Sequence, residues 1–202
     1  IKMKKFISPL KENWSKILER PTKSVDAIEG TVNEVFTDIQ KNGDRAVAKY
    51  TKKFDGVFLE SNLVSAAEIK EAITLVSEDL KEAINFAKEN ITKFHIAQKT
   101  KKVFVETTNG VSCWQEKRPI QKVGLYIPGG TAPLFSTVLM LAVPAQIAGC
   151  KEIVLCSPPN KEGKIHPAIL YTANLCGVTK IVKVGGIQAI AGYTFGTETI
   201  PQ

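Results

Sequence analysis

The chain has 202 residues, enough to bury a hydrophobic core and to form one or two domains. Hydrophobic residues make up 44% of it and charged residues 23%, a composition that excludes a disordered chain. The net charge of +7 is spread along the sequence, and the dense basic cluster of Lys99, Lys101 and Lys102 has no interleaved aromatic residues, so we expect no nucleic-acid partner.

The first residues lack the pattern of a secretory leader. Residues 1–7 are basic and then mildly apolar, but Lys11, Glu12 and Asn13 follow before the apolar core of a signal peptide accumulates. We therefore expect a cytoplasmic protein.

Residues 8–100 are predicted to be helical almost throughout. After a short helix over residues 9–20, Ser24 is expected to cap a second helix whose apolar residues recur every three or four positions. Gly43 is expected to end that helix, and Asp44 to cap a third one.

Two more helices are predicted before residue 100. Ser65 and Glu68 have the spacing of a capping box, in which the serine accepts from a helical amide and the glutamate bonds back to the amide of the serine. A longer helix follows with apolar residues in register over residues 80–94. We interpret the apolar stripes of all these helices as core-forming surfaces.

After residue 102 the pattern changes to strands. Residues 103–107 and 111–117 are predicted to form a hairpin joined by Asn109-Gly110. Further strands at 123–127, 152–156 and 180–184 then alternate with helices at 134–148, 167–176 and 187–195. This alternation predicts an α/β fold with a parallel sheet, and we divide the chain into a helical region, 1–102, and an α/β domain, 103–202.

The nearly uncharged segment 123–149 is not expected to cross a membrane. It contains Pro128, Pro133, Pro144 and four glycines, which disfavour a spanning helix.

Two diglycine loops are the candidate ligand site. One covers residues 126–133 and the other residues 184–189, and each follows a predicted strand and leads into a helix. In a parallel sheet both loops lie at the carboxyl edge, where phosphate-bearing or dinucleotide ligands bind. Neither matches Gly-x-Gly-x-x-Gly, and tight turns explain the glycines equally well. Tyr126 fits either a ring-stacking residue or a core tyrosine, and Gln188 fits either a ligand contact or a local cap.

The chain offers no catalytic set. Its two histidines, His95 and His166, have no acid partner at a suggestive spacing. Cys150 and Cys156 bracket a strand, but Lys151 alone does not produce a reactive thiolate. None of the four cysteines has Cys-x-x-Cys spacing, so buried free thiols are expected rather than disulfides or a metal site.

The run Val-Gly-Leu-Tyr-Ile-Pro-Gly-Gly-Thr-Ala-Pro-Leu-Phe-Ser-Thr-Val-Leu-Met-Leu-Ala at residues 123–142 closely resembles the histidinol dehydrogenase family. Residues 148–150, 154–159 and 184–191 continue the resemblance, and the upstream segments 42–46, 50–55 and 91–95 agree with it. Together these segments extend over essentially the whole chain, which resembles the amino-terminal half of such an enzyme.

The resemblance implies a zinc-dependent enzyme that oxidises L-histidinol through the aldehyde to L-histidine with two NAD molecules, in histidine biosynthesis. It also implies an intertwined homodimer and a Rossmann-like, aldehyde-dehydrogenase-like domain that is incomplete at its carboxyl end here. The NAD contacts of the family fall on Tyr126 and Gln188. The catalytic residues and the zinc ligands are expected beyond residue 202, so the chain alone is expected to be inactive.

Two alternatives remain open on the sequence. One is another aldehyde-dehydrogenase-like NAD(P) oxidoreductase, which should have a nucleophilic cysteine downstream and no zinc. The other is a non-catalytic fragment that binds a nucleotide or dimerises.

Overall fold

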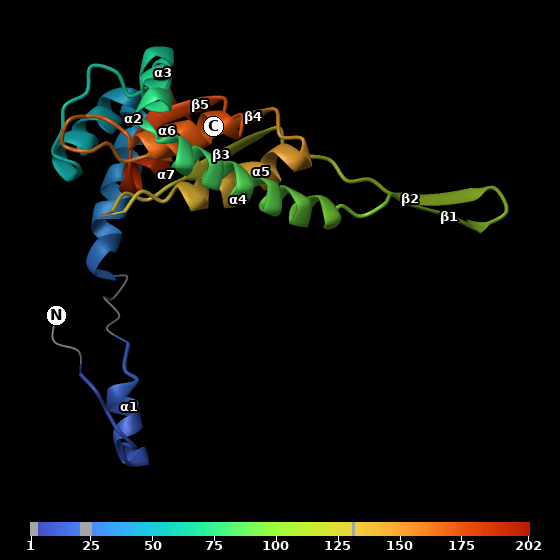
Figure 1. The fold of residues 1–202 in the computed structure, drawn as a ribbon, viewed down its shortest axis with the longest axis horizontal. Coiled ribbons are helices and arrows are strands. Elements are labelled where there is room, and N and C mark those ends of the chain that lie inside the picture. Colours follow the sequence, from blue (N-terminus) through green and yellow to red (C-terminus); the bar gives the residue numbers. More distant parts are fainter. Residues whose placement is uncertain (1–3, 21–25, 131) are drawn as a thin grey trace.

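The computed structural model describes residues 4–20, 26–130 and 132–202, and Figure 1 shows its fold. The chain begins with a short 3-10 helix, Lys11–Asn13, and the four-residue helix α1 (Trp14–Ile17), where one short helix was predicted. Ser24, the predicted cap of the next helix, lies outside the described residues.

Helix α2 (Asp26–Phe54) consists of the second and third predicted helices, which meet at Gly43. Gly43 has φ +51° and ψ −134°, a conformation that favours glycine and interrupts the helix, as predicted. The predicted role of Asp44 is wrong. Its carboxylate accepts from the Thr199 hydroxyl (2.9 Å), and its own amide donates to the Glu198 carboxylate (2.9 Å), so a distant segment caps the second part of α2.

Helices α3 (Ala66–Leu75) and α4 (Glu78–Ala97) follow as predicted. The capping box of α3 is confirmed: the Ser65 hydroxyl accepts from the Glu68 amide, and the Glu68 carboxylate accepts from the Ser65 amide. Ser77 caps α4 by accepting from the Leu80 amide.

The second half of the chain has the predicted alternation of strands and helices. Strands β3 (Lys122–Tyr126), β4 (Glu152–Ser157) and β5 (Lys180–Lys183) form a parallel sheet in the order β3-β4-β5. Helices α5 (Phe135–Ala148), α6 (Pro167–Leu175) and α7 (Gly186–Phe195) follow these strands in turn. Five of the six residues of β4 are buried, as is typical of a parallel strand covered on both faces. The predicted α/β class is confirmed.

Helices cover both faces of this sheet. Alternate strand residues point to opposite faces, so the sheet contributes to two separate cores. One core packs Leu125, Leu155 and Ile181 against α3, α4, α5 and α6, and the other packs Val154 and Val182 against α2 and α7. Both cores therefore combine residues from before and after residue 102, and the division into two regions at that point stays a prediction.

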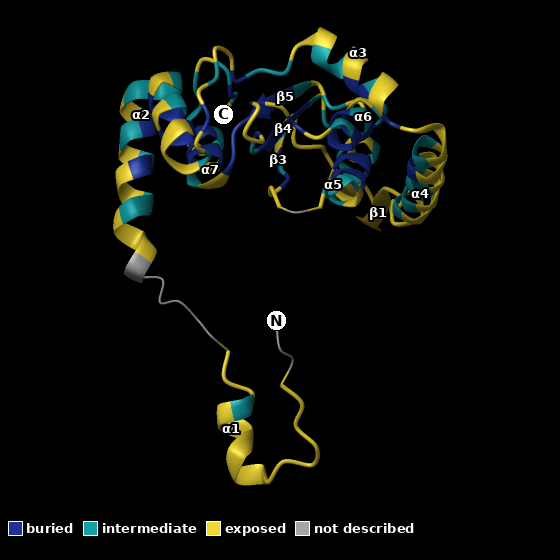
Figure 2. Ribbon diagram, turned by 60° about the vertical axis from the view of Figure 1, so that its left-hand side comes forward, coloured by how far each residue is buried: buried dark blue, intermediate teal, exposed yellow. Residues whose placement is uncertain are grey.

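The predicted hairpin is present but stands apart from both cores. Strands β1 (Val103–Thr108) and β2 (Val111–Gln115) pair antiparallel, and Gly110 at the turn has φ +82°. Every residue of both strands is exposed, and the hairpin extends away from the sheet in Figure 1. Helix α1 is likewise exposed on nearly all sides (Figure 2).

The outer edge of β5 is covered by the segment before α3. Val64 donates its amide to the Ile181 carbonyl (3.0 Å), and Lys183 donates its amide to the Asn62 carbonyl (2.7 Å). This pairing places the amino end of α3 beside β5. None of the described helices is long and apolar enough to cross a membrane.

Candidate functional site

The two diglycine loops lie close together at the carboxyl edge of the sheet, with Pro158 between them. A Cβ atom on Gly129 would lie 2.6 Å from Pro158 Cγ, and one on Gly185 would lie 2.5 Å from Pro158 Cβ. The absence of a side chain at Gly129 and at Gly185 therefore leaves room for Pro158, which follows β4. The second glycines differ: Gly130 has open space where a Cβ would be, and Gly186 has φ +57°. Packing thus explains Gly129 and Gly185, whereas Gly130 borders free space.

Tyr126 connects the two loops. It ends β3, its side chain is half-buried, and its hydroxyl accepts a hydrogen bond from the Gly186 amide at 3.0 Å. Gly186 is the first residue of α7, so the tyrosine hydroxyl bonds one of the amides that a helix leaves without an internal partner. Tyr126 therefore fixes the start of α7 relative to the end of β3.

Gln188 lies in the first turn of α7 and is completely buried. Its Nε2 donates to Asp55 Oδ2 at 3.0 Å, but its Oε1 has no hydrogen-bond partner in the part of the chain that the structure describes. A buried carbonyl oxygen without a donor is unfavourable, so such atoms usually have an external partner or a functional reason. The structure brings Gln188 to the same turn as Tyr126.

Asp55 was missed by the sequence reasoning. It follows α2 directly and lies 133 residues before Gln188 in the chain, so no local pattern linked the two. Burial raises the pKa of the Asp55 carboxyl, and the hydrogen bond from Gln188 offsets part of that rise. The only signal for it was its place in segment 50–55, one of those that carry the family resemblance.

A crevice of about 330 Å³ opens beside the first diglycine loop, on the face of the sheet that α3 covers. Its wall is formed by the loops after β3 and β4, by the start of α6 and by one side of α3. The polar residues that line it are Glu68, Glu71, Ser157, Asn160, Lys164 and His166. Neither Tyr126 nor Gln188 lines it, whereas Gly130 and Pro158 do.

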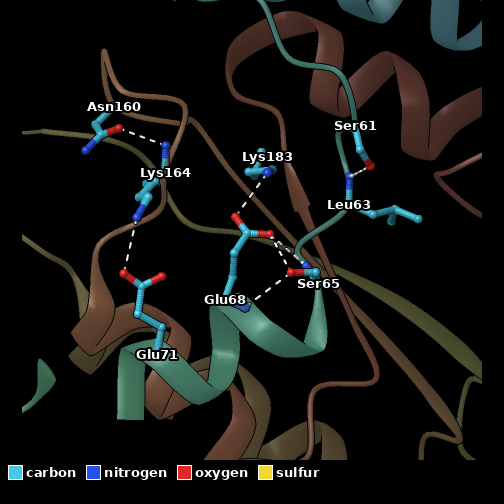
Figure 3. A network of polar contacts seen from close by, with 8 residues as sticks. All are labelled: Ser61, Leu63, Ser65, Glu68, Glu71, Asn160, Lys164 and Lys183. Carbon is cyan, nitrogen blue, oxygen red and sulfur yellow. Dashed lines mark hydrogen bonds and ion pairs between the residues drawn. The ribbon is translucent and has the colours of Figure 1, made fainter. Parts of the chain in front are cut away.

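Charged residues at the crevice are paired (Figure 3). Glu68 Oε1 accepts from Lys183 Nζ at 3.1 Å, and at the rim Glu71 pairs with Lys164 at 3.3 Å. Burial alone would raise the pKa of Glu68, but the hydrogen bonds from Ser65 and Lys183 outweigh it, so the pKa lies below its ordinary value. The side chain of Lys183 is only 10% exposed, which makes this pair much drier than the rim pair.

Each histidine contacts a residue close to it in the sequence. His166 precedes α6, and its Nδ1 accepts from the Ala168 amide at 3.1 Å, which makes it the cap of that helix. His95 is near the end of α4 and lies against Gln98. Among the described residues no three His, Cys, Asp or Glu side chains gather as a metal site.

The cysteines are all free, and two of the four are buried as expected. Cys156 is fully buried on β4, and this burial raises the pKa of its thiol to about 12, so it is protonated at neutral pH and is not a nucleophile. Cys176 is buried after α6, whereas Cys150 is half-buried. Cys113 on the exposed hairpin contradicts the expectation of a buried thiol.

The chain matches one family over most of its length. Residues 18–202 match the family model described as Histidinol dehydrogenase. Histidinol dehydrogenase of Bacteroides thetaiotaomicron is 53% identical over 200 residues, which are 99% of this chain and 47% of that protein. Histidinol dehydrogenase of Escherichia coli K12 is 50% identical over 192 residues, which are 95% of this chain and 43% of that protein.

A solved structure is similar in fold as well as in sequence. The crystal structure of histidinol dehydrogenase from Elizabethkingia anophelis superposes with a TM-score of 0.89 at 54% identity, covering 98% of this chain and 46% of that one. This chain therefore spans about half the length of the proteins that it matches.

Proposed function

Because the chain belongs to the histidinol dehydrogenase family, we propose that the intact protein containing it oxidises L-histidinol through the aldehyde to L-histidine, with two molecules of NAD as the oxidant. The observation that carries the proposal is identity of at least 50% to curated histidinol dehydrogenases over 95% or more of the chain. Another aldehyde-dehydrogenase-like NAD(P) oxidoreductase, one of the two alternatives open on the sequence, gains no support from these relatives, which are histidinol dehydrogenases.

The contribution of this chain is one side of the NAD site, in an α/β domain that we propose to be Rossmann-like and related to the aldehyde dehydrogenases. The residues that would hold the cofactor are Tyr126, Gln188 and the backbone around Gly130 and Gly186. Three observations fit a bound nucleotide: free space at Gly130, the amino end of a ten-residue helix at α7, and the unpartnered oxygen of Gln188.

NAD supplies the hydride acceptor for both oxidations, and the residues of this chain bind and orient it. Tyr126 holds the end of β3 against the start of α7, so the two loops keep a fixed separation. Pro158 fills the space between Gly129 and Gly185 and excludes water from it. Proton transfer and zinc binding belong to residues after residue 202 in this proposal, and no step is assigned to zinc here.

The remaining expectations concern the intact protein. We propose that it is a cytoplasmic homodimer with L-histidinol as its substrate, and that nucleic acids and membranes are not its partners. The apolar residues exposed on the β1–β2 hairpin and on α1 fit a chain with further covering surfaces.

The test is turnover of the intact protein with histidinol, NAD and zinc, followed as formation of NADH. We expect NAD reduction that depends on histidinol, and none from residues 1–202 alone. Tyr126→Ala should weaken NAD binding to the intact protein by about tenfold, since it removes both a ring surface and the bond to Gly186. An intact protein that does not oxidise histidinol would disprove the proposal, and turnover by residues 1–202 would disprove the assignment of the chemistry to later residues.

A further inference from the structure

The contact between Asp55 and Gln188 joins two elements that are far apart in sequence. Helix α2 packs against α7 on one face of the sheet, and Asp55 immediately follows the last residue of α2. Its Oδ2 accepts from Gln188 Nε2 at 3.0 Å, and no ion pair of Asp55 occurs among the described residues. Burying half of a carboxylate without a neighbouring cation is unfavourable, so the hydrogen bond to Gln188 is the main interaction that offsets this desolvation.

The two ends of the Gln188 amide are chemically different, and this contact distinguishes them. An ionised carboxylate only accepts hydrogen bonds, so the NH2 group of Gln188 faces Asp55 and the carbonyl oxygen faces elsewhere. That oxygen lies beside the diglycine turn: a Cβ on Gly186 would be 3.1 Å from Oε1. The orientation therefore leaves an acceptor at the start of α7.

This acceptor is one of two buried side-chain atoms without a hydrogen-bond partner in the described part of the chain. The other is the hydroxyl of Thr51, four residues before Asp55. An unpaired buried carbonyl oxygen is unfavourable, and a ligand N–H or O–H that reaches it supplies the missing hydrogen bond. The start of α7 therefore has a free acceptor, Gln188 Oε1, for a donor group of a ligand.

We propose that Asp55 is a positioning residue for the nucleotide: it holds the Gln188 amide so that Oε1 accepts a hydrogen bond from an N–H or O–H group of NAD. This inference rests on the proposed function, because it requires NAD to bind at the start of α7. It assigns a role at the nucleotide site to a residue of the amino-terminal helical region. Asp55 itself touches Gln188 and not the reacting atoms, so its effect passes through Gln188.

A double-mutant cycle in the intact protein tests this role. Asp55→Ala should weaken NAD binding about five- to tenfold, because the Gln188 amide is then free to turn. In a Gln188→Ala background the same substitution should change the NAD dissociation constant by less than about twofold, since the residue that it positions is gone. Asp55→Asn keeps an oxygen that accepts from Nε2 and should recover most of the affinity.

Kinetic constants distinguish a positioning role of Asp55 from a purely structural one. The KM for NAD should rise in Asp55→Ala, while the KM for histidinol and kcat at saturating NAD stay within about twofold of the wild type. Asp38→Ala is the matched control, because Asp38 is an acidic residue of α2 that bonds Lys49 (2.6 Å) and Asn42 (2.7 Å) rather than α7. It should lower thermal stability without changing NAD affinity.

The outcomes separate this inference from the proposed function. Unchanged NAD binding in Asp55→Ala, or an equal loss in both Gln188 backgrounds, overturns the role of Asp55 while histidinol-dependent NAD reduction by the wild type still stands. A wild-type protein that neither binds NAD nor reduces it overturns the proposed function itself. A loss of NAD affinity on Asp55→Ala that occurs when Gln188 is present, and not in the Gln188→Ala variant, supports the inference.

Discussion

Glu68 takes part in two separate interactions at the level of a single residue. Its Oε2 accepts from the Ser65 amide (2.8 Å) at the start of α3, and its Oε1 accepts from Lys183 on β5 (3.1 Å). The capping box was visible in the sequence because its two residues are three positions apart. The ion pair was not, because Lys183 lies 115 residues away.

Glu68→Gln should lower the free energy of unfolding of the intact protein by about 1–3 kcal/mol at neutral pH, because Lys183 is left without its charged partner. The native pKa of Glu68 lies below its ordinary 4.5, so its contribution is present above that pH and is lost as the pH falls through the native value. Denaturant unfolding from about pH 6 down to about pH 3 should therefore show a steeper loss in the wild type than in Glu68→Gln.

Glu71→Gln is the control for this comparison. Glu71 lies one turn later on α3, and its pair with Lys164 is 52% and 59% exposed, so the substitution should cost less than about 1 kcal/mol. Equal losses for the two variants, or a pH profile that Glu68→Gln leaves unchanged, would contradict the role given to Glu68.

Helix α2 shows how one element depends on a distant segment. Its kink at Gly43 places the Asp44 amide 2.9 Å from the Glu198 carboxylate, to which it donates a hydrogen bond. This hydrogen bond is the largest contribution to the lowered pKa of Glu198. A Cβ on Gly43 would lie 2.6 Å from Glu198 Oε2. The backbone conformation therefore favours glycine at this position, and a Cβ there would also displace the end of the Glu198 side chain.

Gly43→Ala should lower the free energy of unfolding by about 1–3 kcal/mol, since alanine strains the backbone at φ +51°. Gly30→Ala, in the same helix, should have the opposite sign and add about 0.5–1 kcal/mol, because no atom lies within 4 Å of its Cβ position. Thermal and denaturant unfolding of both variants measure these two changes in the free energy of unfolding. A neutral or stabilising Gly43→Ala would show that the kink is not required.

The hairpin is the clearest exposed apolar feature at the scale of the whole molecule. Phe104 is 63% exposed and Trp114 is 59% exposed, and the two are cross-strand partners on one face of the hairpin. Exposed apolar surface of this kind drives association when nothing covers it.

Residues 1–202 produced alone should therefore self-associate with increasing concentration, and the double substitution Phe104→Ser and Trp114→Ser should weaken the association about tenfold or more. Sedimentation velocity measures both. Phe58→Ser removes a side chain outside the hairpin that is 72% exposed, and it should leave the association unchanged. A chain that stays monomeric at all concentrations, or equal effects of the two changes, would contradict this prediction.

The sequence by itself determined the family, the α/β class, nearly every helix and strand, and the choice of the two diglycine loops as the candidate site. These features depend on local signals: apolar periodicity, capping spacing and turn residues act within a few positions of each other. The capping box at Ser65 and the end of a helix at Gly43 were predicted for this reason. Tyr126 and Gln188 were chosen from the loops that follow strands, and their contact with NAD stays a prediction.

Only the tertiary structure decided what these residues touch. The Asp55 contact with Gln188, the Glu198 contact with Asp44 and the position of Pro158 between two glycines join residues at least 27 positions apart. Such contacts form when helices pack on the two faces of the sheet, and no local pattern records which residues then meet. For the same reason the sequence left the glycines open between ligand binding and turns, whereas the packed loops show that Gly129 and Gly185 leave room for Pro158.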